Sequence, residues 1–342
     1  MINNISFKKS ILLLVILSIV VFINGCRIVN ADSIFNNNKI HVYHIKGSLN
    51  GIAIDGSGNI WVTNASNRTV TQISSTGSIL ETYPLGDSPL NIAIDRHGNI
   101  WILMEFSLTE LNPVPSGGVH IKNIHNKNLE WGSANSGGIA INGGNNILVS
   151  HDDTIMEFSH SGSIEYKIND NSLDLHGGDI AIGYGAVWVV GRRSITRLND
   201  SGLKIYSIGS YTTAIALDTF NSGIIWVTYA QRYGREGDVI KLNSSGATLG
   251  MYKVGVNPEA IATDGSGNVW VANQGDYINN DNGSVSELSP SGVLLKTYNV
   301  GQSASAIAID DSGNVWVACR NDVYELINVA TPVKTPLVSY LK

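Results

Sequence analysis

The sequence predicts an all-β fold, a seven-bladed β-propeller of four-stranded antiparallel blades. The first observation behind this prediction is a phrase that returns along the chain: "GIAIDGSGNIWVTN" at 51–64 becomes "IATDGSGNVWVAN" at 261–273 and "IAIDDSGNVWVAC" at 307–319. The second is the spacing of its seven copies, in steps of 40, 47, 41, 35, 46 and 46 residues, which is typical of propeller blades. The copies begin at Ile52, Ile92, Ile139, Ile180, Ile215, Ile261 and Ile307.

Each copy contains the pattern of four strands. A small apolar strand such as "IAID" is followed by a Gly/Asn/Asp turn and by a β-rich strand such as "NIWVTN". The fourth strands include "SILETYPLG" from Ser78 and "VLLKTYNVG" from Val293, usually entered through a Ser-Gly or Thr-Gly pair that allows a tight hairpin. The third strands alternate apolar with polar residues, as half-buried strands do. They begin at Thr69, Ser107, Thr154, Ser194, Asp238, Ser284 and Asp322.

The last copy lacks a fourth strand of its own. No Gly turn follows Leu326, and Pro332 and Pro336 disfavour a central strand in what remains. The missing pattern stands at the other end of the chain, in "IHVYHIKG" at 40–47. We therefore expect this segment, called the clasp here, to complete the seventh blade and remove an exposed sheet edge. The propeller is expected to span 40–327, with a C-terminal extension at 328–342.

Tryptophan in the second strand of six copies is interpreted as packing between adjacent blades rather than as an aromatic ligand cage. The third copy has Leu148 instead. The Asp after the first strand, as in Asp55, Asp95 and Asp310, is interpreted as a turn former rather than a ligand. The tryptophans are Trp61, Trp101, Trp188, Trp226, Trp270 and Trp316.

The N-terminus reads as an export signal at 1–25. Lys8 and Lys9 precede the apolar run "ILLLVILSIVVFI", which is shorter than the roughly 18 to 20 residues of a membrane span. The following "FINGC" resembles a bacterial lipobox, which predicts a lipid anchor at Cys26, a linker at 26–39 and a cell-envelope lipoprotein. The alternative is cleavage after Ala31, giving a soluble secreted or periplasmic protein.

The net charge of the mature chain disfavours several classes of partner. Without Lys8 and Lys9, the 22 basic residues fall to 20 against 28 acidic ones, so the net charge is about −8. Such a surface disfavours nucleic acid and anionic lipid.

Once Cys26 is acylated or removed, only Cys319 remains, so no disulfide is expected and a buried structural thiol is favoured over a reactive one. The protein is expected to be a monomer.

The repeated phrase followed by "TVTQIS" resembles the NHL repeat, and it resembles the virginiamycin B lyase (streptogramin lyase) family over nearly all of 40–327. That family implies a seven-bladed propeller. It also implies an Mg²⁺-assisted lyase that pairs a His two residues before the "IAI" strand with a Glu fourteen positions later. At this spacing the chain offers Gly137 with His151 and Glu259 with Asn273, and no copy offers His and Glu together. Because propellers of this kind include binding platforms, lactonases and lyases, the fold alone does not decide the activity.

Two long loops on neighbouring blades, 230–238 and 273–284, are the candidate binding wall on the face where the inner strands begin. Aromatic and Arg side chains are enriched at binding hot spots. The competing interpretation is a tolerated surface insertion. The candidate contacts are Arg232, Tyr233, Arg235, Tyr277, Tyr229, Glu259 and Asn273.

A possible catalytic centre lies on the same face. His151 and His176 are the candidate catalytic residues, with Glu105 and Asp152 as candidate ligands of Mg²⁺ or Ca²⁺, since such clusters bind metals or transfer protons.

The leading hypothesis from the sequence is a binding module of the cell envelope, presenting its loop face to a protein, peptide or glycan. The alternative is a metal-dependent lyase or lactonase with its site at the channel mouth.

Overall fold

The computed structural model describes residues 40–114, 118–124, 136–170, 173–176, 178–218, 223–230, 234–276 and 282–335. The expected signal at 1–25, the linker at 26–39 and the lipid attachment at Cys26 lie outside these residues. So do three expected contacts, Arg232, Tyr233 and Tyr277. Within the described ranges, no helix is both long enough and apolar enough to cross a bilayer.

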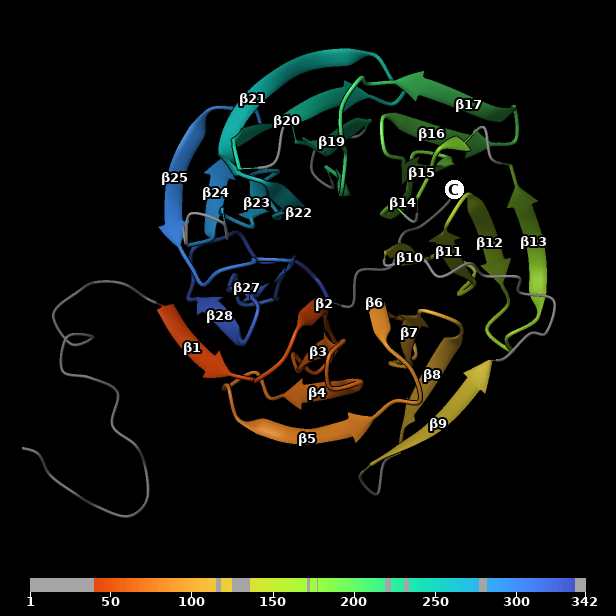
Figure 1. The fold of residues 1–342 in the computed structure, drawn as a ribbon, viewed down its shortest axis with the longest axis vertical. Helices are drawn as coiled ribbons and strands as arrows, with labels where there is room; N and C mark the ends of the chain where they lie inside the picture. The colour runs from red at the N-terminus through yellow and green to blue at the C-terminus, as the bar shows by residue number, and fades with distance from the viewer. Residues whose placement is uncertain are drawn as a thin grey trace, which may run out of the picture. The chain divides into compact units, whose positions relative to one another are not determined.

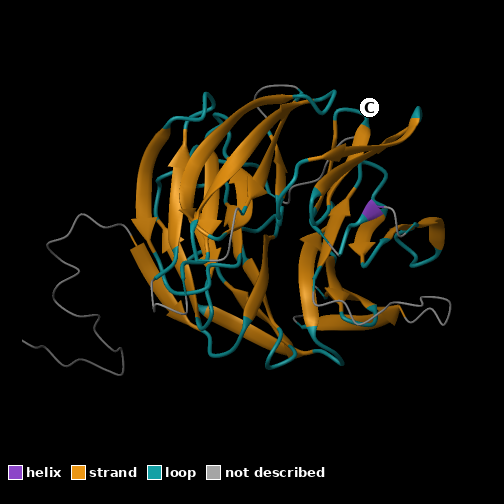
Figure 2. Cartoon of the chain, turned by 45° about the horizontal axis from the view of Figure 1, so that its top comes forward, coloured by secondary structure: helices purple, strands orange, loops and turns teal. Residues whose placement is uncertain are grey.

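The described chain is a seven-bladed β-propeller, as predicted. Seven antiparallel four-stranded sheets stand around a central axis, which Figure 1 views end on. Figure 2 shows that strands make up most of the described chain. Each of blades 1 to 6 uses four consecutive strands, from the axis outward, and blade 7 has the order β26-β27-β28-β1.

The strands of the first four blades have the following bounds. Blade 1 has β2 (Leu49–Ile54), β3 (Ile60–Asn64), β4 (Thr69–Ile73) and β5 (Ile79–Pro84); blade 2 has β6 (Pro89–Ile94), β7 (Ile100–Met104), β8 (Leu108–Pro113) and β9 (Val119–Ile124). Blade 3 has β10 (Gly137–Ile141), β11 (Ile147–His151), β12 (Thr154–Phe158) and β13 (Ile164–Asn169); blade 4 has β14 (Ile180–Gly183), β15 (Ala186–Val190), β16 (Ser194–Asn199) and β17 (Gly202–Ser207).

The remaining three blades follow the same plan. Blade 5 has β18 (Ile215–Leu217), β19 (Ile224–Tyr229), β20 (Glu236–Asn243) and β21 (Thr248–Val256); blade 6 has β22 (Pro258–Thr263), β23 (Val269–Asn273), β24 (Ser284–Leu288) and β25 (Leu294–Asn299). Blade 7 has β26 (Ala306–Ile309), β27 (Val315–Ala318), β28 (Asp322–Leu326) and β1 (Ile40–His44).

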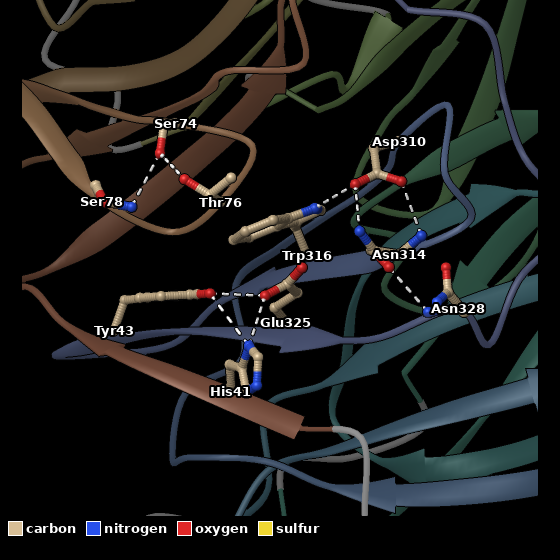
Figure 3. A network of polar contacts seen from close by, with 10 residues as sticks. All are labelled: His41, Tyr43, Ser74, Thr76, Ser78, Asp310, Asn314, Trp316, Glu325 and Asn328. Atoms are coloured by element: carbon tan, nitrogen blue, oxygen red, sulfur yellow. Dashed lines mark hydrogen bonds and ion pairs between the residues drawn. The ribbon is translucent and has the colours of Figure 1, made fainter. Parts of the chain in front are cut away.

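The clasp completes blade 7, which confirms the expected ring closure. β1 pairs antiparallel with β28, from Ile40 opposite Leu326 to His44 opposite Asp322. Tyr43 stacks on Trp316 with the ring centroids 5.6 Å apart, and its hydroxyl donates to Glu325 Oε2 at 2.6 Å (Figure 3). The two ends of the propeller are therefore joined by backbone pairing, by an aromatic stack and by a hydrogen bond.

The tryptophans pack between blades, as predicted. Trp61 is 1% exposed and lies in one buried cluster with Ile92 and Ile100 of the next blade. In five blades a tyrosine of the outermost strand also lies against the tryptophan, with ring centroids 5.6 to 6.2 Å apart, close enough for aromatic attraction. The pairs are Trp61–Tyr83, Trp188–Tyr206, Trp226–Tyr252, Trp270–Tyr298 and Trp316–Tyr43.

The Asp after the inner strand forms the turn, as predicted, and it also holds the tryptophan. Asp310 Oδ1 accepts the backbone N–H groups of Ser312 at 2.9 Å and Asn314 at 2.8 Å. Its Oδ2 accepts Asn314 Nδ2 and Trp316 Nε1, each at 2.9 Å (Figure 3). The turn chemistry and the core packing of the blade thus depend on one carboxylate. Asp55, Asp95 and Asp264 accept the equivalent indole N–H in their own blades.

Replacing this carboxylate is expected to be costly. Asp310→Ala leaves two turn N–H groups and a buried indole N–H without their acceptor, so we expect a loss of about 2–3 kcal/mol of unfolding free energy. Asp311→Ala, at the exposed next position, is the matched control, with an expected change below about 0.5 kcal/mol. Denaturant unfolding of both variants measures the difference, and equal losses would contradict this role.

The C-terminal extension lies across one end of the ring, as far as it is described. Val329 and Ala330 donate their N–H groups to Gly313 O at 3.1 and 3.0 Å. Thr331 N donates to Asp264 Oδ2, and Thr335 Oγ1 donates to a carbonyl at residue 55, both at 3.1 Å. These acceptors are on the inner turns of blades 7, 6 and 1, so the segment bridges three blades at the end opposite the starts of the inner strands.

Candidate functional site

A cavity of about 700 Å³ follows the axis of the propeller and is lined by the inner strands of all seven blades. Most of its wall is formed by the repeated Ile and Ala residues of these strands. Val333 and Thr335 of the C-terminal segment contribute to the lining at one end. The starts of the inner strands define the other end, where polar side chains replace the apolar wall.

We call this polar end of the cavity the polar ring. Each blade contributes to it one polar residue at or just before its inner strand, a position set by the repeat itself. The repeated phrase thus places equivalent residues at equivalent positions around the axis. The polar ring consists of Asn50, Asn91, Ser136, Asp179, Thr213, Glu259 and Ser305.

Six of the seven members tie their blade to a neighbour. Asn50 and Asn91 donate through Nδ2 to the carbonyls of Pro89 and Gly137, each at 3.2 Å. The other four bonds cross between blades in the same way, so these side chains have a clear structural use. They are Ser136 Oγ to His176 O at 2.8 Å, Ile215 N to Asp179 Oδ2 at 3.2 Å, Thr213 Oγ1 to Pro258 O at 2.9 Å, and Ser305 Oγ to Leu49 O at 2.7 Å.

Glu259 of blade 6 is the exception. No hydrogen bond or ion pair from the described part of the chain reaches its carboxylate. The side chain is partly exposed to the cavity but lies deep inside the propeller, and this burial raises the pKa of the carboxyl to about 7. Burial is therefore the cause of the raised pKa, and no bond from the described residues holds this carboxylate in place.

Asp179 is the second acidic group of the polar ring. Burial raises its pKa to about 6, although the N–H groups of Ile180 and Ile215 favour the ionised form. The two acidic residues stand on blades 4 and 6, on either side of the blade that carries Thr213. Arg320, which is exposed, is the one other charged residue among the described residues that line the cavity. The polar ring therefore contains both acidic side chains among the described residues that line the cavity.

The structure brings together three of the four residues of the expected catalytic centre. His151 is 1% exposed, and its Nε2 lies 3.1 Å from Glu105 O while its Nδ1 lies 3.6 Å from Asp152 Oδ2. Burial lowers the pKa of His151, which favours the neutral ring at pH 7. His176 is exposed and pairs instead with Asp174, at 3.0 Å. Neither histidine is among the described residues that line the axial cavity.

The expected metal ligands remain a prediction. Glu105 contacts His151 through its backbone carbonyl rather than its carboxylate. Among the residues that the structure describes, no three His, Cys, Asp or Glu side chains are grouped so that they could hold a metal ion.

The expected binding wall divides into different environments. Arg235 is exposed and Tyr229 is partly buried. Asn273 is 0% exposed, and its Nδ2 donates to Ser286 Oγ at 3.0 Å and to Ser284 Oγ at 3.2 Å, so it stabilises blade 6 and offers no surface. Cys319 is also buried, at 1% exposure, and burial raises its thiol pKa to about 12, which makes it the inert structural cysteine that was favoured.

The comparison with solved structures places the fold among propellers of several functions. Virginiamycin B lyase from Staphylococcus aureus has a TM-score of 0.70 and 17% identity, with 84% of this chain and 98% of that chain covered. The WD40 domain of Neurospora crassa Pan2 has a TM-score of 0.61 and 11% identity, covering 84% and 92%. A chain of the mitotic checkpoint complex has a TM-score of 0.68 and 12% identity, covering 91% and 99%.

No protein-family model matches the sequence, and neither does any curated protein. The chain is thus a seven-bladed propeller of the architecture shared by streptogramin-type lyases and WD40 interaction domains. At 11 to 17% identity this likeness establishes the fold, and the activity has to be argued from the residues of the cavity.

Proposed function

We propose that this protein is a binding module of the cell envelope that takes a segment of a protein or peptide partner at the polar ring. The observation that carries the proposal is the ring itself: six members hold the blades together, whereas Glu259 faces the cavity without a partner among the described residues. A cavity that combines Ile and Ala side chains with converging polar groups is a usual form of ligand site. Similar propellers solved within complexes support partner binding in general.

Export to the envelope is part of this proposal. It is motivated by the apolar run at 11–23 and by the lipobox-like "FINGC", which lie outside the described residues. Lipidation at Cys26 would tether the module to a membrane, whereas cleavage after Ala31 would release it. The intact mass of the mature protein distinguishes the two, since only the first product begins with an acylated cysteine.

The binding proposal is tested by selecting random peptides against residues 32–342 and then challenging them with two variants. Gln274→Trp places a bulky ring at a residue that lines the cavity. Asp200→Trp adds the same ring at an exposed turn between the third and fourth strands of blade 4, away from the cavity, and is the matched control. We expect the selected peptides to bind the unaltered chain and the control equally, and Gln274→Trp at least about tenfold more weakly. Equal binding to all three proteins would contradict a site at the polar ring.

A second candidate function is an enzyme, a lyase or lactonase acting in the same cavity. The observation that favours it is a carboxyl group with a pKa of about 7 beside a cavity, which suits a general acid or base at neutral pH. One neighbouring solved structure is a catalytically inactive virginiamycin B lyase with quinupristin. Incubation of this chain with quinupristin and with simple lactones tests the candidate. Turnover that is lost in Glu259→Gln would support it, and absence of turnover in the unaltered chain would remove it.

A further inference from the structure

We propose that the polar ring recognises a primary ammonium group on a flexible alkyl chain, such as a lysine side chain, which is held by the Glu259 carboxylate together with Asp179. The inference rests on the proposed function, because it names the chemical group of the partner that enters the polar ring. Three features of the ring point to this group: its inter-blade bonds, its acidic side chains and their placement on different blades.

The inter-blade bonds single out Glu259. At the equivalent positions Asn50, Thr213 and Ser305 each bond to a neighbouring blade. An Asn, Ser or Thr at 259 would suit such a bond, yet the chain has a longer, ionisable side chain there and leaves it without a described partner. A role in holding the blades together therefore does not account for this residue.

No ion pair among the described residues neutralises the acidic groups of the ring. Burying a carboxylate without an opposite charge is unfavourable, and a bound cation removes most of that penalty. Arg320 also lines the cavity, but no described ion pair joins it to either acid. The elements packed against β22 add charged or titratable groups that do not line the cavity: Tyr229, Glu236, Asp238 and Lys241.

The placement of the acidic acceptors on different blades favours ammonium over other cations. Ammonium has three donors that can reach acceptors on different blades, whereas guanidinium is best matched by one carboxylate that accepts two parallel bonds. Glu259 and Asp179 stand on blades 6 and 4, with polar side chains of other blades around them. A metal ion would need several ligands at one point, and the described residues hold no such group.

The test compares two small probes by ligand-observed NMR at pH 8. N-acetyl-lysine methylamide carries the ammonium group, and N-acetyl-norleucine methylamide has nearly the same chain without the charge. We expect the lysine probe to bind at least about tenfold more tightly than the neutral one. Because Glu259 must be ionised, we also expect the lysine probe to bind about tenfold more weakly at pH 6, where the ammonium itself is still charged.

Three variants assign the effect. Glu259→Gln keeps the size of the side chain and is expected to abolish the preference for the lysine probe. Arg320→Gln removes the other charged lining side chain outside the acidic pair, and it is expected to leave this preference unchanged or to increase it. Asp179→Asn is expected to reduce the preference while Glu259 is intact. An arginine analogue of the probe reports whether guanidinium is accepted as well.

Several results would overturn the inference. Equal binding of the two probes, an unchanged preference in Glu259→Gln, or no binding of the lysine probe at about 20 mM each contradicts it. The proposed function fails separately. Selected peptides that need the open cavity but no lysine would leave the binding module standing and remove the ammonium site. If no peptide binds the ring, the probe titration still decides whether a cation does.

Discussion

A chain without residues 40–47 is expected to lose about 5 kcal/mol or more of unfolding free energy, which is roughly a third or more of the stability of a typical domain. The deletion removes the outermost strand of blade 7, with all five register pairs between β1 and β28. It also leaves Glu325, whose side chain is 8% exposed in the intact protein, without the Tyr43 hydroxyl. The newly exposed edge of β28 would in addition pair readily with other chains.

A milder change separates the side-chain contribution from the strand itself. Tyr43→Ala removes the stack on Trp316 and the bond to Glu325, so we expect a loss of about 2–4 kcal/mol. Tyr166→Ala is the matched control, because Tyr166 lies on an outermost strand, is 46% exposed and belongs to the blade that has Leu148 in place of tryptophan. Its expected loss is below about 1 kcal/mol.

Thermal melts followed by circular dichroism, with sedimentation to detect association, measure these effects. The deletion is expected to melt far below the intact chain or to aggregate, and Tyr43→Ala to melt between them. A deletion that melts with the intact protein would mean that β1 is an accessory to a ring already closed by the contacts between blades 7 and 1. Equal shifts for the two tyrosine variants would mean that the stack on Trp316 does not support the closure.

The fold could be predicted because the residues that determine each blade lie close together in the sequence. The Asp55 turn, the adjacent Trp61 strand and the third strand from Thr69 all lie within one repeat, and turn chemistry and alternation predict them without knowledge of the neighbours. The clasp was also predictable. The seventh copy lacks a fourth-strand pattern after Leu326, and the one unassigned pattern of this kind stands at 40–47. Tyr43 stands in the clasp where Tyr83 and Tyr298 stand in their own outermost strands, but the contact of each tyrosine with a tryptophan was not predicted and is seen only in the structure.

The candidate site was less predictable, because its geometry arises between blades. Glu259 was expected as one contact of the binding wall. It differs from its six counterparts because they bond to neighbouring blades and it has no such bond among the described residues. No pattern within a single repeat indicates bonds between blades. Asp179 was missed although every blade has a polar residue at or just before the start of its inner strand. Asn273 illustrates the opposite error, since a polar residue at the end of a second strand is here buried against Ser286. The role of each of these three residues depends on contacts with chain segments that are distant in the sequence.

Replacing Glu259 by glutamine is expected to stabilise the unliganded protein above pH 7 and to leave it unchanged near pH 4. The folded carboxyl has a pKa of about 7 against 4.5 for the free group, because burial disfavours its charge. Between these values the folded state holds a proton that the unfolded state has released, so stability falls as the pH rises through this window. At pH 8 nearly the full cost is present, and its removal is worth about 3 kcal/mol.

The difference between the variant and the unaltered chain isolates this effect. The pH profile of the protein alone also contains Asp179, which acts in the same direction, and the buried His151, whose lowered pKa acts in the opposite direction by destabilising the fold in acid.

Glu81→Gln, at an exposed position of β5, is the matched control and should shift the melting temperature little at any pH. A melting temperature raised by several degrees in Glu259→Gln at pH 8, but not at pH 4, would show that the chain retains a destabilising carboxylate. Such a residue is expected where ligand recognition, rather than packing, determines its identity. No rise at pH 8 would mean that solvent in the cavity already relieves the burial, and the electrostatic basis of the ammonium site would be removed with it.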